Sequence, residues 1–527
     1  MNGAQALIRT LVGSGADVCF ANPGTSEMHF VAALDDVRGM RGVLTLFEGV
    51  ATGAADGYAR MADRPAVTLL HLGPGLGNGL ANLHNARRAG SPVVNVVGDH
   101  ATFHKPLDAP LESDIDAVAG SVSGWLRRSA TAADVGPDAA AAVAAATGPP
   151  GRVATLVLPA DTAWSGGGVV APPAAAAPAP RVDADAVEAA AKALRSARES
   201  GAPCVLLIGG DATRGPGPAA AGRIAAATGA KVLAETFPAR VERGAGRPPV
   251  SRLGYVPEMA AHQLAGARHL VLVGARSPVT FFGYPGKPSD LVPQGCEVHT
   301  VAARDGAAAA ALEALAELVA PGAVPAVAEA ARPPLPTGAL TAETAAAVVG
   351  ALLPEGAIVV DESITSGLGL PGATAGAPPH DWLTLTGGSI GYGLPAATGA
   401  AVACPERPVW CLQADGSAMY TISALWTQAR EGLDVTTVLY NNSAYAILRM
   451  ELLQVGAARD AAAPAGERAR RLFDLGGPAL DFVSLARGMG VPAVRATTAE
   501  ELADALRHAQ AEPGPHLVEA VVPPIVP

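Results

Sequence analysis

Short runs of β-branched and other apolar residues recur along this chain without the apolar–polar alternation of a half-exposed strand. A strand that is apolar at every position is covered on both faces, and such strands belong to parallel sheets flanked by helices. Longer helical patterns separate the runs, which is the order expected of α/β domains. The expected strands are Pro65–Leu72, Pro92–Val97, Val153–Leu158, Cys204–Ile208, Leu270–Val273, Ala357–Val360, Val409–Gln413 and Val435–Tyr440.

Two stretches rich in Pro, Ala and Gly interrupt this order, at residues 166–180 and 321–337. Both lack hydrophobic periodicity, which is typical of linkers. We therefore expect three α/β domains, each a doubly wound parallel sheet, at residues 1–165, 182–320 and 338–527. A chain of 527 residues is long enough for three domains of ordinary size.

Composition excludes several classes of function. The formal net charge is −11 at pH 7, so we do not expect nucleic-acid binding, which needs a basic face to neutralise the phosphates. Half of the residues are apolar, but no run approaches the ~18 apolar residues of a membrane span, and no signal peptide is evident. We expect a cytoplasmic protein with no nucleic-acid or membrane partner. The cysteines form no CxxC pair, which favours buried thiols over disulfides or zinc; they are Cys19, Cys204, Cys296, Cys404 and Cys411.

Two neighbouring strand ends in the last segment present oxygen ligands. The strand Val409–Gln413 runs into Asp415-Gly416-Ser417, and the strand Val435–Tyr440 ends in Asn441-Asn442. The carboxyl ends of parallel strands meet at one edge of a sheet, so a carboxylate and an amide oxygen should converge there, as Mg²⁺ requires. The helix that begins at Gly416 can hold phosphate oxygens with its free N–H groups. The alternative is that Asp415-Gly416 is an ordinary turn and Asn441-Asn442 an ordinary loop. Either motif on its own would favour that alternative, but the spacing between the two favours a metal site.

A second group of polar residues lies in the first segment. Glu48 precedes a helical pattern in which Asp56 and Arg60, four residues apart, share one face as an ion pair. The apolar neighbours Phe47 and Val50 argue against full exposure of Glu48. The alternative is a solvated acid that the helix dipole favours at the first turn.

A third motif is the stretch TGGSIGYGLPAA at residues 386–397, which places the bulky Ile390 after two glycines. An ordinary glycine-rich loop does not explain that bulky residue. Nearby, residues 367–372 match GxGxxG, but Pro371 falls within the match and no second strand with a terminal acid follows. We therefore reject a dinucleotide-binding site there.

Together these motifs resemble the thiamine diphosphate (ThDP) superfamily of acetolactate synthases, benzoylformate decarboxylases and pyruvate decarboxylases. D-G-S followed by N-N looks like its metal–diphosphate motif, with Ala414 in place of the usual glycine. The Glu48–Arg60 helix and the 386–397 stretch look like its cofactor-binding helix and loop. The resemblance extends to Pro515–Glu519 and covers almost the whole chain. It implies the ThDP-binding fold, with a pyrimidine-binding first domain, a middle domain and a diphosphate- and Mg²⁺-binding third domain.

The resemblance also implies the cofactor-binding residues. Glu48 would bond the aminopyrimidine and promote loss of the thiazolium C2 proton. The Mg²⁺ ligands would be Asp415, Asn442 and the main-chain oxygen of Ala444. The Gly388 carbonyl and the Ile390 N–H would hold the aminopyrimidine, while the Ile390 side chain bends the cofactor. The full set is Glu48, Ser363, Thr365, Ser366, Gly388, Ile390, Asp415, Gly416, Ser417, Asn442, Tyr445, Ala446 and Ile447.

Two further stretches, Asn22–Glu27 and His71–Asn78, resemble loops that face the substrate in benzoylformate decarboxylases. The resemblance makes Thr25 and His71 catalytic candidates, because a histidine with a pKa near ~6.5 suits proton transfer. A core histidine that closes a strand is the alternative for His71.

The chain departs from the best-known members of the superfamily at several pocket positions. Acetolactate synthases carry glutamine and tryptophan where Asp99 and Glu451 stand, and pyruvate decarboxylases carry glutamate in place of Leu448. In a gapped alignment, Phe281 or Phe282 replaces the middle-domain histidine of benzoylformate decarboxylases. The expected substrate residues are Thr25, His71, Asp99, Phe281, Phe282, Ile447 and Glu451.

The resemblance predicts a ThDP- and Mg²⁺-dependent enzyme that decarboxylates a small 2-oxo acid. The resulting enamine would be protonated or added to a second carbonyl, as acetolactate synthases do. Active sites shared between subunits imply a homodimer or homotetramer. Two alternatives stay open: a flavin- or nucleotide-linked oxidoreductase on the same fold, although no motif supports FAD, and a non-catalytic ThDP-fold binding or regulatory protein.

Overall fold

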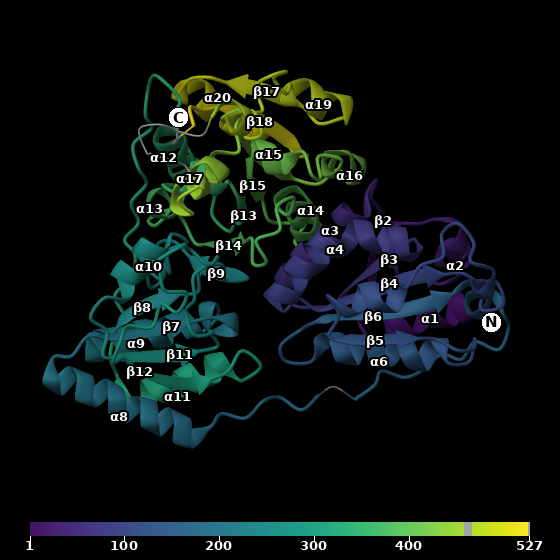
Figure 1. Ribbon diagram of the computed structural model, residues 1–527, viewed down its shortest axis with the longest axis horizontal. Coiled ribbons are helices and arrows are strands. Elements are labelled where there is room, and N and C mark those ends of the chain that lie inside the picture. Colours follow the sequence, from purple (N-terminus) through teal and green to yellow (C-terminus); the bar gives the residue numbers. More distant parts are fainter. Residues whose placement is uncertain (176, 458–465, 525–527) are drawn as a thin grey trace.

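The computed structural model describes residues 1–527 except 176, 458–465 and 525–527. Within the described residues the strands form three sheets, which lie in three lobes of the molecule (Figure 1). The carboxyl-terminal lobe, with α12–α20, borders both the amino-terminal and the middle lobe. This architecture confirms the expected α/β fold class, whereas the exact domain boundaries remain a prediction.

The first sheet is parallel throughout and has the strand order β2-β1-β3-β4-β6-β5. Helices α1, α2, α6 and α7 cover one face, and α3, α4 and α5 cover the other. The strands are β1 (Val18–Asn22), β2 (Arg41–Leu44), β3 (Ala66–Leu70), β4 (Val93–Asp99), β5 (Trp125–Arg128) and β6 (Val153–Pro159). The helices are α1 (Gly3–Gly13), η1 (Thr25–Glu27), α2 (Met28–Asp36), α3 (Glu48–Ala62), α4 (Leu72–Ala89), η2 (Lys105–Leu107), α5 (Ile115–Gly120), α6 (Val135–Thr147) and α7 (Ala160–Trp164).

The middle sheet is also parallel, with the order β10-β8-β7-β11-β12. Helices α8, α9 and α11 pack on one face, and α10 packs on the other. The strands are β7 (Cys204–Ile208), β8 (Lys231–Ala234), β10 (Ser251–Arg252), β11 (His269–Val273) and β12 (Glu297–Ala302). The helices are α8 (Ala184–Ser200), η3 (Gly210–Thr213), α9 (Gly217–Thr228), α10 (Pro257–Leu264) and α11 (Ala308–Val319).

The third sheet has the order β17-β18-β16-β15-β13-β14-β9 and departs from the expected all-parallel arrangement. Its edge strand β9 (Arg240–Arg243) comes from the middle segment and pairs antiparallel with β14. The other strands are β13 (Ile358–Glu362), β14 (His380–Thr384), β15 (Val409–Ala414), β16 (Val435–Asn441), β17 (Ala493–Ala496) and β18 (His516–Val521). The helices are α12 (Ala342–Leu352), η4 (Ile364–Gly367), α13 (Leu370–Ala373), α14 (Gly393–Ala403), α15 (Asp415–Ala418), α16 (Ala424–Glu431), α17 (Ala446–Gln454), α18 (Glu467–Arg470), α19 (Phe482–Gly488) and α20 (Ala499–Ala511).

Helices α3 and α14 join the first and third domains through a continuous hydrophobic core (Figure 1). Their backbones approach so closely that a Cβ at Gly57 would collide with the carbonyl oxygen of Ala396, and one at Gly399 with that of Ala54. Only glycine permits such an approach between two helix backbones. The crossing therefore fixes the position of the loop before α14 relative to the first domain.

The structure also tests the expectations about membrane spans and cysteines. No helix in the described part of the chain is long and apolar enough to cross a membrane. All five cysteines are free thiols, as expected. Cys19, Cys204 and Cys411 are buried, whereas Cys296 and Cys404 are only partly buried, so the expectation of full burial is wrong for these two.

Candidate active site

The third sheet reverses its winding direction between β13 and β15. The chain passes from β13 to β14 on one side, then returns to form β15 on the other side of β13. In open parallel sheets, ligands bind at such a reversal, beyond the carboxyl ends of the strands. There η4, which contains Thr365 and Ser366, follows β13, and Asp415 follows β15. The structure thus brings Thr365 and Ser366, two of the expected cofactor-binding residues, and the expected metal ligand Asp415 to neighbouring strand ends.

Asp415 and Asn442 also converge, as the motif spacing predicts. The Asp415 carboxylate accepts hydrogen bonds from the backbone N–H of Gly416 at 2.7 Å and of Asn442 at 3.1 Å. The Asn442 side-chain oxygen accepts from the N–H of Ala444 at 3.0 Å. Burial raises the pKa of Asp415, and the surrounding N–H donors oppose that rise. Carboxylate, amide and main-chain oxygens at this edge are a donor set that suits Mg²⁺.

The loop before α14 is held by a buried carboxylate that the sequence analysis did not single out. Glu362, at the end of β13, accepts hydrogen bonds from the N–H groups of Gly391, Tyr392 and Gly393, and from the side-chain amide of Gln413. The distances lie between 2.8 and 3.1 Å. Burial raises the pKa of Glu362, while these donors favour its ionised form. A carboxylate at a helix N-terminus also complements the helix dipole.

The same loop is bonded to helix α4 of the first domain. The Asn85 side chain exchanges hydrogen bonds with the backbone of Ser389, and the Asn82 amide donates to the Gly391 carbonyl. By contrast, the Gly388 carbonyl and the Ile390 N–H have no hydrogen-bond partner in the described part of the chain. These two groups are the ones expected to hold the aminopyrimidine, so the pattern of free and satisfied groups fits that ligand.

Glu48 lies at the first turn of α3 and is 6% exposed. Its carboxylate accepts a hydrogen bond from the Asn78 side chain of α4 at 3.0 Å. The structure therefore excludes the alternative of a solvated surface acid. No hydrogen bond joins Glu48 to Asp415 or Asn442 within the described residues.

His71 and Thr25 lie at the winding reversal of the first sheet, where β1 and β3 end side by side. The Nδ1 atom of His71 is 2.8 Å from the Glu27 carboxylate, which also accepts from the Gly24 N–H at 2.8 Å. Glu27 is buried, which raises its pKa, and the nearby His71 opposes that rise. A carboxylate on Nδ1 directs Nε2 outward for proton exchange. Glu27 is the last residue of the Asn22–Glu27 motif, but the sequence alone indicates no role for it.

The expected substrate residues separate into two groups. Asp99 is buried and forms ion pairs with Arg128 and, at 3.1 Å, with Lys105, so its carboxylate already has partners. Phe281, in contrast, packs against the loop before α14, because a Cβ atom added at Gly388 in that loop would collide with the Phe281 ring.

An aromatic cluster surrounds Phe281. Its ring centroid lies 5.0 Å from that of Phe282, 5.2 Å from that of Tyr255 and 5.8 Å from that of Phe237. The hydroxyls of Tyr255 and Tyr284 donate to the Glu451 carboxylate at 3.0 and 3.1 Å. Burial, reinforced by Glu451, raises the pKa of Tyr284 to about 12. The structure thus joins Phe281, Phe282 and Glu451 in one region next to the loop.

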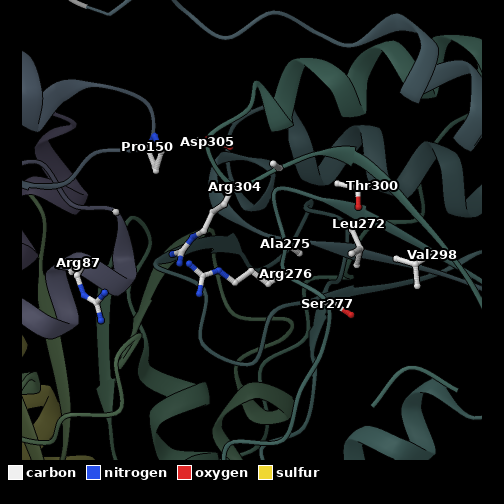
Figure 2. Close-up of a pocket in the computed structure, with 12 residues that line it drawn as sticks. Arg87, Pro150, Leu272, Ala275, Arg276, Ser277, Val298, Thr300, Arg304 and Asp305 are labelled. Carbon is white, nitrogen blue, oxygen red and sulfur yellow. The ribbon is translucent and has the colours of Figure 1, made fainter. Parts of the chain in front are cut away.

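A cavity of about 610 Å³ lies between the first and middle domains, away from the ThDP motifs (Figure 2). Arg87 approaches it from α4, while Arg276 and Arg304 extend from loops that follow β11 and β12. Glu235 lies nearby and is partly buried; desolvation raises the pKa of its carboxyl, and the positive charges of Arg304 and Arg276 oppose that rise. The cavity is therefore rich in positive charge and suits an anionic group.

Comparisons with known proteins agree with this geometry. Models of the thiamine pyrophosphate enzyme family match the chain, the N-terminal TPP binding domain over residues 1–119 and the C-terminal one over residues 371–520. A Mycobacterium tuberculosis protein provisionally named acetolactate synthase large subunit IlvX is 69% identical over 100% of both chains. Benzoylformate decarboxylase of Pseudomonas aeruginosa is 33% identical over 97% of both. The solved ThDP-dependent 4-hydroxybenzoylformate decarboxylase of Rhodococcus jostii superposes with a TM-score of 0.84 at 25% identity, covering 99% of both chains.

The Glu362 hydrogen bonds predict a clear stability effect. Glu362→Gln replaces one acceptor oxygen by an NH₂ group that faces backbone donors, so we expect a loss of about 2–4 kcal/mol in the free energy of unfolding. Urea unfolding measures this loss. The control Glu355→Gln removes an exposed carboxylate and should change stability by less than about 0.5 kcal/mol. Equal stability of the two variants would contradict the role assigned to Glu362.

Proposed function

The chain belongs to the thiamine pyrophosphate enzyme family, and from this premise we propose that it decarboxylates an aromatic 2-oxo acid at a site completed by a second copy of the chain. It is a ThDP-dependent enzyme of the decarboxylase and carboligase class. The finer expectations belong to the same proposal, namely Mg²⁺ as the metal, a cytoplasmic location and a homodimer or homotetramer.

The residues of the third domain fit the charged end of the cofactor. Asp415, Asn442 and the Ala444 carbonyl would hold Mg²⁺, and the hydroxyls and N–H groups at the ends of β13 and β15 would hold the diphosphate. Glu48, buried and oriented by Asn78, would hold the aminopyrimidine. When bound, ThDP supplies a nucleophilic carbon and a sink for the electrons that carbon dioxide leaves behind.

The first domain supplies the groups that move protons. Among the described residues, the buried Glu48 carboxylate has one side-chain donor, Asn78, which leaves acceptor capacity for a ligand. Glu27 binds Nδ1 of His71 and so orients the ring. Nε2 is then available to give a proton to the substrate or take one from it. We assign Glu27 as a positioning residue and His71 as a proton-transfer residue.

The aromatic cluster around Phe281 supports an aromatic substrate. The cluster borders Gly388 in the cofactor loop, and Phe281 is 40% exposed, so its ring retains free surface. Aromatic rings attract one another in edge-to-face and offset arrangements at such separations. A methyl group, as in pyruvate, would leave most of this apolar surface uncovered. The relatives that act on benzoylformate and 4-hydroxybenzoylformate, according to their names, support the same substrate class.

Exposed apolar side chains beside both halves of the site support completion by a second copy. Leu46 next to Glu48 is 50% exposed, and Tyr420 beside the Asp415 helix is 54% exposed. Covering large exposed apolar groups with a partner chain lowers the free energy, which favours association at this surface. A two-fold arrangement would set the first domain of one copy against the third domain of the other.

A flavin- or nucleotide-linked activity remains the second candidate, and one observation favours it. The cavity lined by Arg87, Arg276 and Arg304 suits the phosphates of such a cofactor. Bound flavin would give the purified protein an absorbance band near ~450 nm, and its absence after reconstitution with FAD would eliminate this candidate.

Glu48→Gln tests the catalytic assignment. The amide cannot exchange a proton as the carboxylate does, so we expect turnover to fall by about 100-fold or more. ThDP and Mg²⁺ binding, measured by calorimetry, should stay within about 5-fold of wild type because the shape is conserved. Glu199→Gln, on an exposed turn of α8, is the control and should retain full turnover. Near-normal turnover of Glu48→Gln would contradict the assignment.

Product analysis with benzoylformate, pyruvate and branched 2-oxo acids tests the substrate proposal. We expect wild-type kcat/KM to be highest for benzoylformate, with benzaldehyde as product. Phe281→Ala should lower kcat/KM for benzoylformate by about 10–100-fold but change that for pyruvate little. Phe103→Ala, which removes an exposed ring elsewhere, is the control. A preference for pyruvate, or an equal loss for both substrates, would contradict an aromatic pocket.

A further inference from the structure

The middle domain carries a cluster of metal-binding residue types at the amino ends of its last two strands. In the parallel register, His269 at the start of β11 lies opposite Glu297 at the start of β12. His299 lies two residues after Glu297, so both side chains project from the same face of β12. Val298 and Thr300 of β12 line the arginine-rich cavity, so the cluster projects from the opposite face of that strand. It contains none of the ThDP-motif residues.

The three side chains direct one ligand atom each to a common point. His269 Nδ1 lies 3.3 Å from His299 Nε2 and 3.6 Å from a Glu297 carboxylate oxygen. The third side of the triangle, from His299 Nε2 to the same Glu297 oxygen, is 3.8 Å. Within the described residues, this is the one group of three such side chains whose ligand atoms all lie within 4.8 Å of one another.

These separations match the coordination shell of a small divalent metal ion. Zinc bonds to histidine nitrogen and carboxylate oxygen are about 2.0–2.2 Å long, which places neighbouring ligands of a tetrahedral site about 3.3–3.6 Å apart. The observed triangle needs only a few tenths of an ångström of adjustment to form one face of that tetrahedron. A pair of imidazoles with one carboxylate favours zinc and similar transition metals over Mg²⁺ or Ca²⁺, which prefer oxygen alone.

The exposure of the cluster also suits a metal. The two imidazoles are mostly buried, at 17% and 22% side-chain exposure, whereas Glu297 is 71% exposed. An ion can therefore enter from solvent, and a water molecule can complete the shell.

We propose that His269, Glu297 and His299 form a binding site for a divalent transition-metal ion, with Zn²⁺ as the best fit and one coordination position open to solvent. Bound metal would fasten β12, the edge strand of the middle sheet, to β11. Edge strands expose unpaired backbone groups, and a metal clip at one end limits their fraying. The site is independent of the ThDP chemistry proposed above.

Calorimetric titration with Zn²⁺ tests the site on the full chain, previously saturated with ThDP and excess Mg²⁺ to fill the Asp415 site. We expect one Zn²⁺ per chain at micromolar or tighter affinity, and a rise in the melting temperature of several degrees. His299→Ala should weaken Zn²⁺ binding by about 100-fold and abolish the rise in melting temperature. Glu297→Gln should weaken binding as well, because it removes the anionic ligand while keeping the shape of an exposed side chain.

The matched control is His262→Ala, which removes an exposed histidine of α10 in the same domain and should bind Zn²⁺ as wild type does. Metal-free melting curves verify that each variant is folded. If His299→Ala does not fold, Glu297→Gln alone provides the test. Wild-type protein that binds no Zn²⁺ once Mg²⁺ is in excess would overturn the proposal. So would folded His299→Ala and Glu297→Gln variants with undiminished affinity, since these residues would then form only a hydrogen-bonded pair and a surface ion pair.

Discussion

The close crossing of α3 and α14 is the contact that holds the loop before α14 against the first domain of the same chain. Arg60 of α3 reinforces it. Within the helix, its guanidinium is held by both oxygens of Asp56 at 2.6 and 2.9 Å. The remaining donors of Arg60 reach the Thr384 carbonyl at 2.7 Å and the Tyr392 hydroxyl at 2.9 Å in the third domain. A hydrogen bond from a charged donor contributes about 1.5–3 kcal/mol, so these bonds of Arg60 link the two domains firmly. The loop between Thr384 and Tyr392 consequently has a fixed orientation.

That fixed loop explains how a chain can present selected backbone groups to a cofactor. Glu362 satisfies the N–H groups at the start of α14, and Asn82 and Asn85 satisfy groups between Ser389 and Gly391. Gly388 and Ile390 are only partly buried, so the backbone groups left unpaired in this otherwise bonded loop are accessible to a ligand. Both sheets also place their polar residues at winding reversals, which is where α/β domains create crevices. The same topological feature, a winding reversal, therefore places Asp415 in the third domain and His71 in the first domain.

Much of this could be predicted from the sequence because the signals are local. Each of the eight expected strands is present within a few residues, since continuous apolar runs define buried parallel strands. Asp415 and Asn442 converge because each follows a strand of the same sheet. The pairing of β9 with β14 could not be predicted, because it joins residues about 140 positions apart. The partners of Glu362 and Glu27 were missed for a related reason. A buried acid becomes meaningful only when the donors that the fold brings to it are known.

Complementation between two inactive variants measures most directly whether two copies share each site. Glu48→Gln and Asp415→Ala chains are mixed after mild dissociation, and turnover is compared with that of each variant alone. If the first domain of one copy serves the third domain of the other, half of the sites in mixed dimers carry neither change. Random exchange would then restore about a quarter of wild-type turnover. A mixture that forms hybrid dimers yet stays as inactive as its components would contradict a shared site.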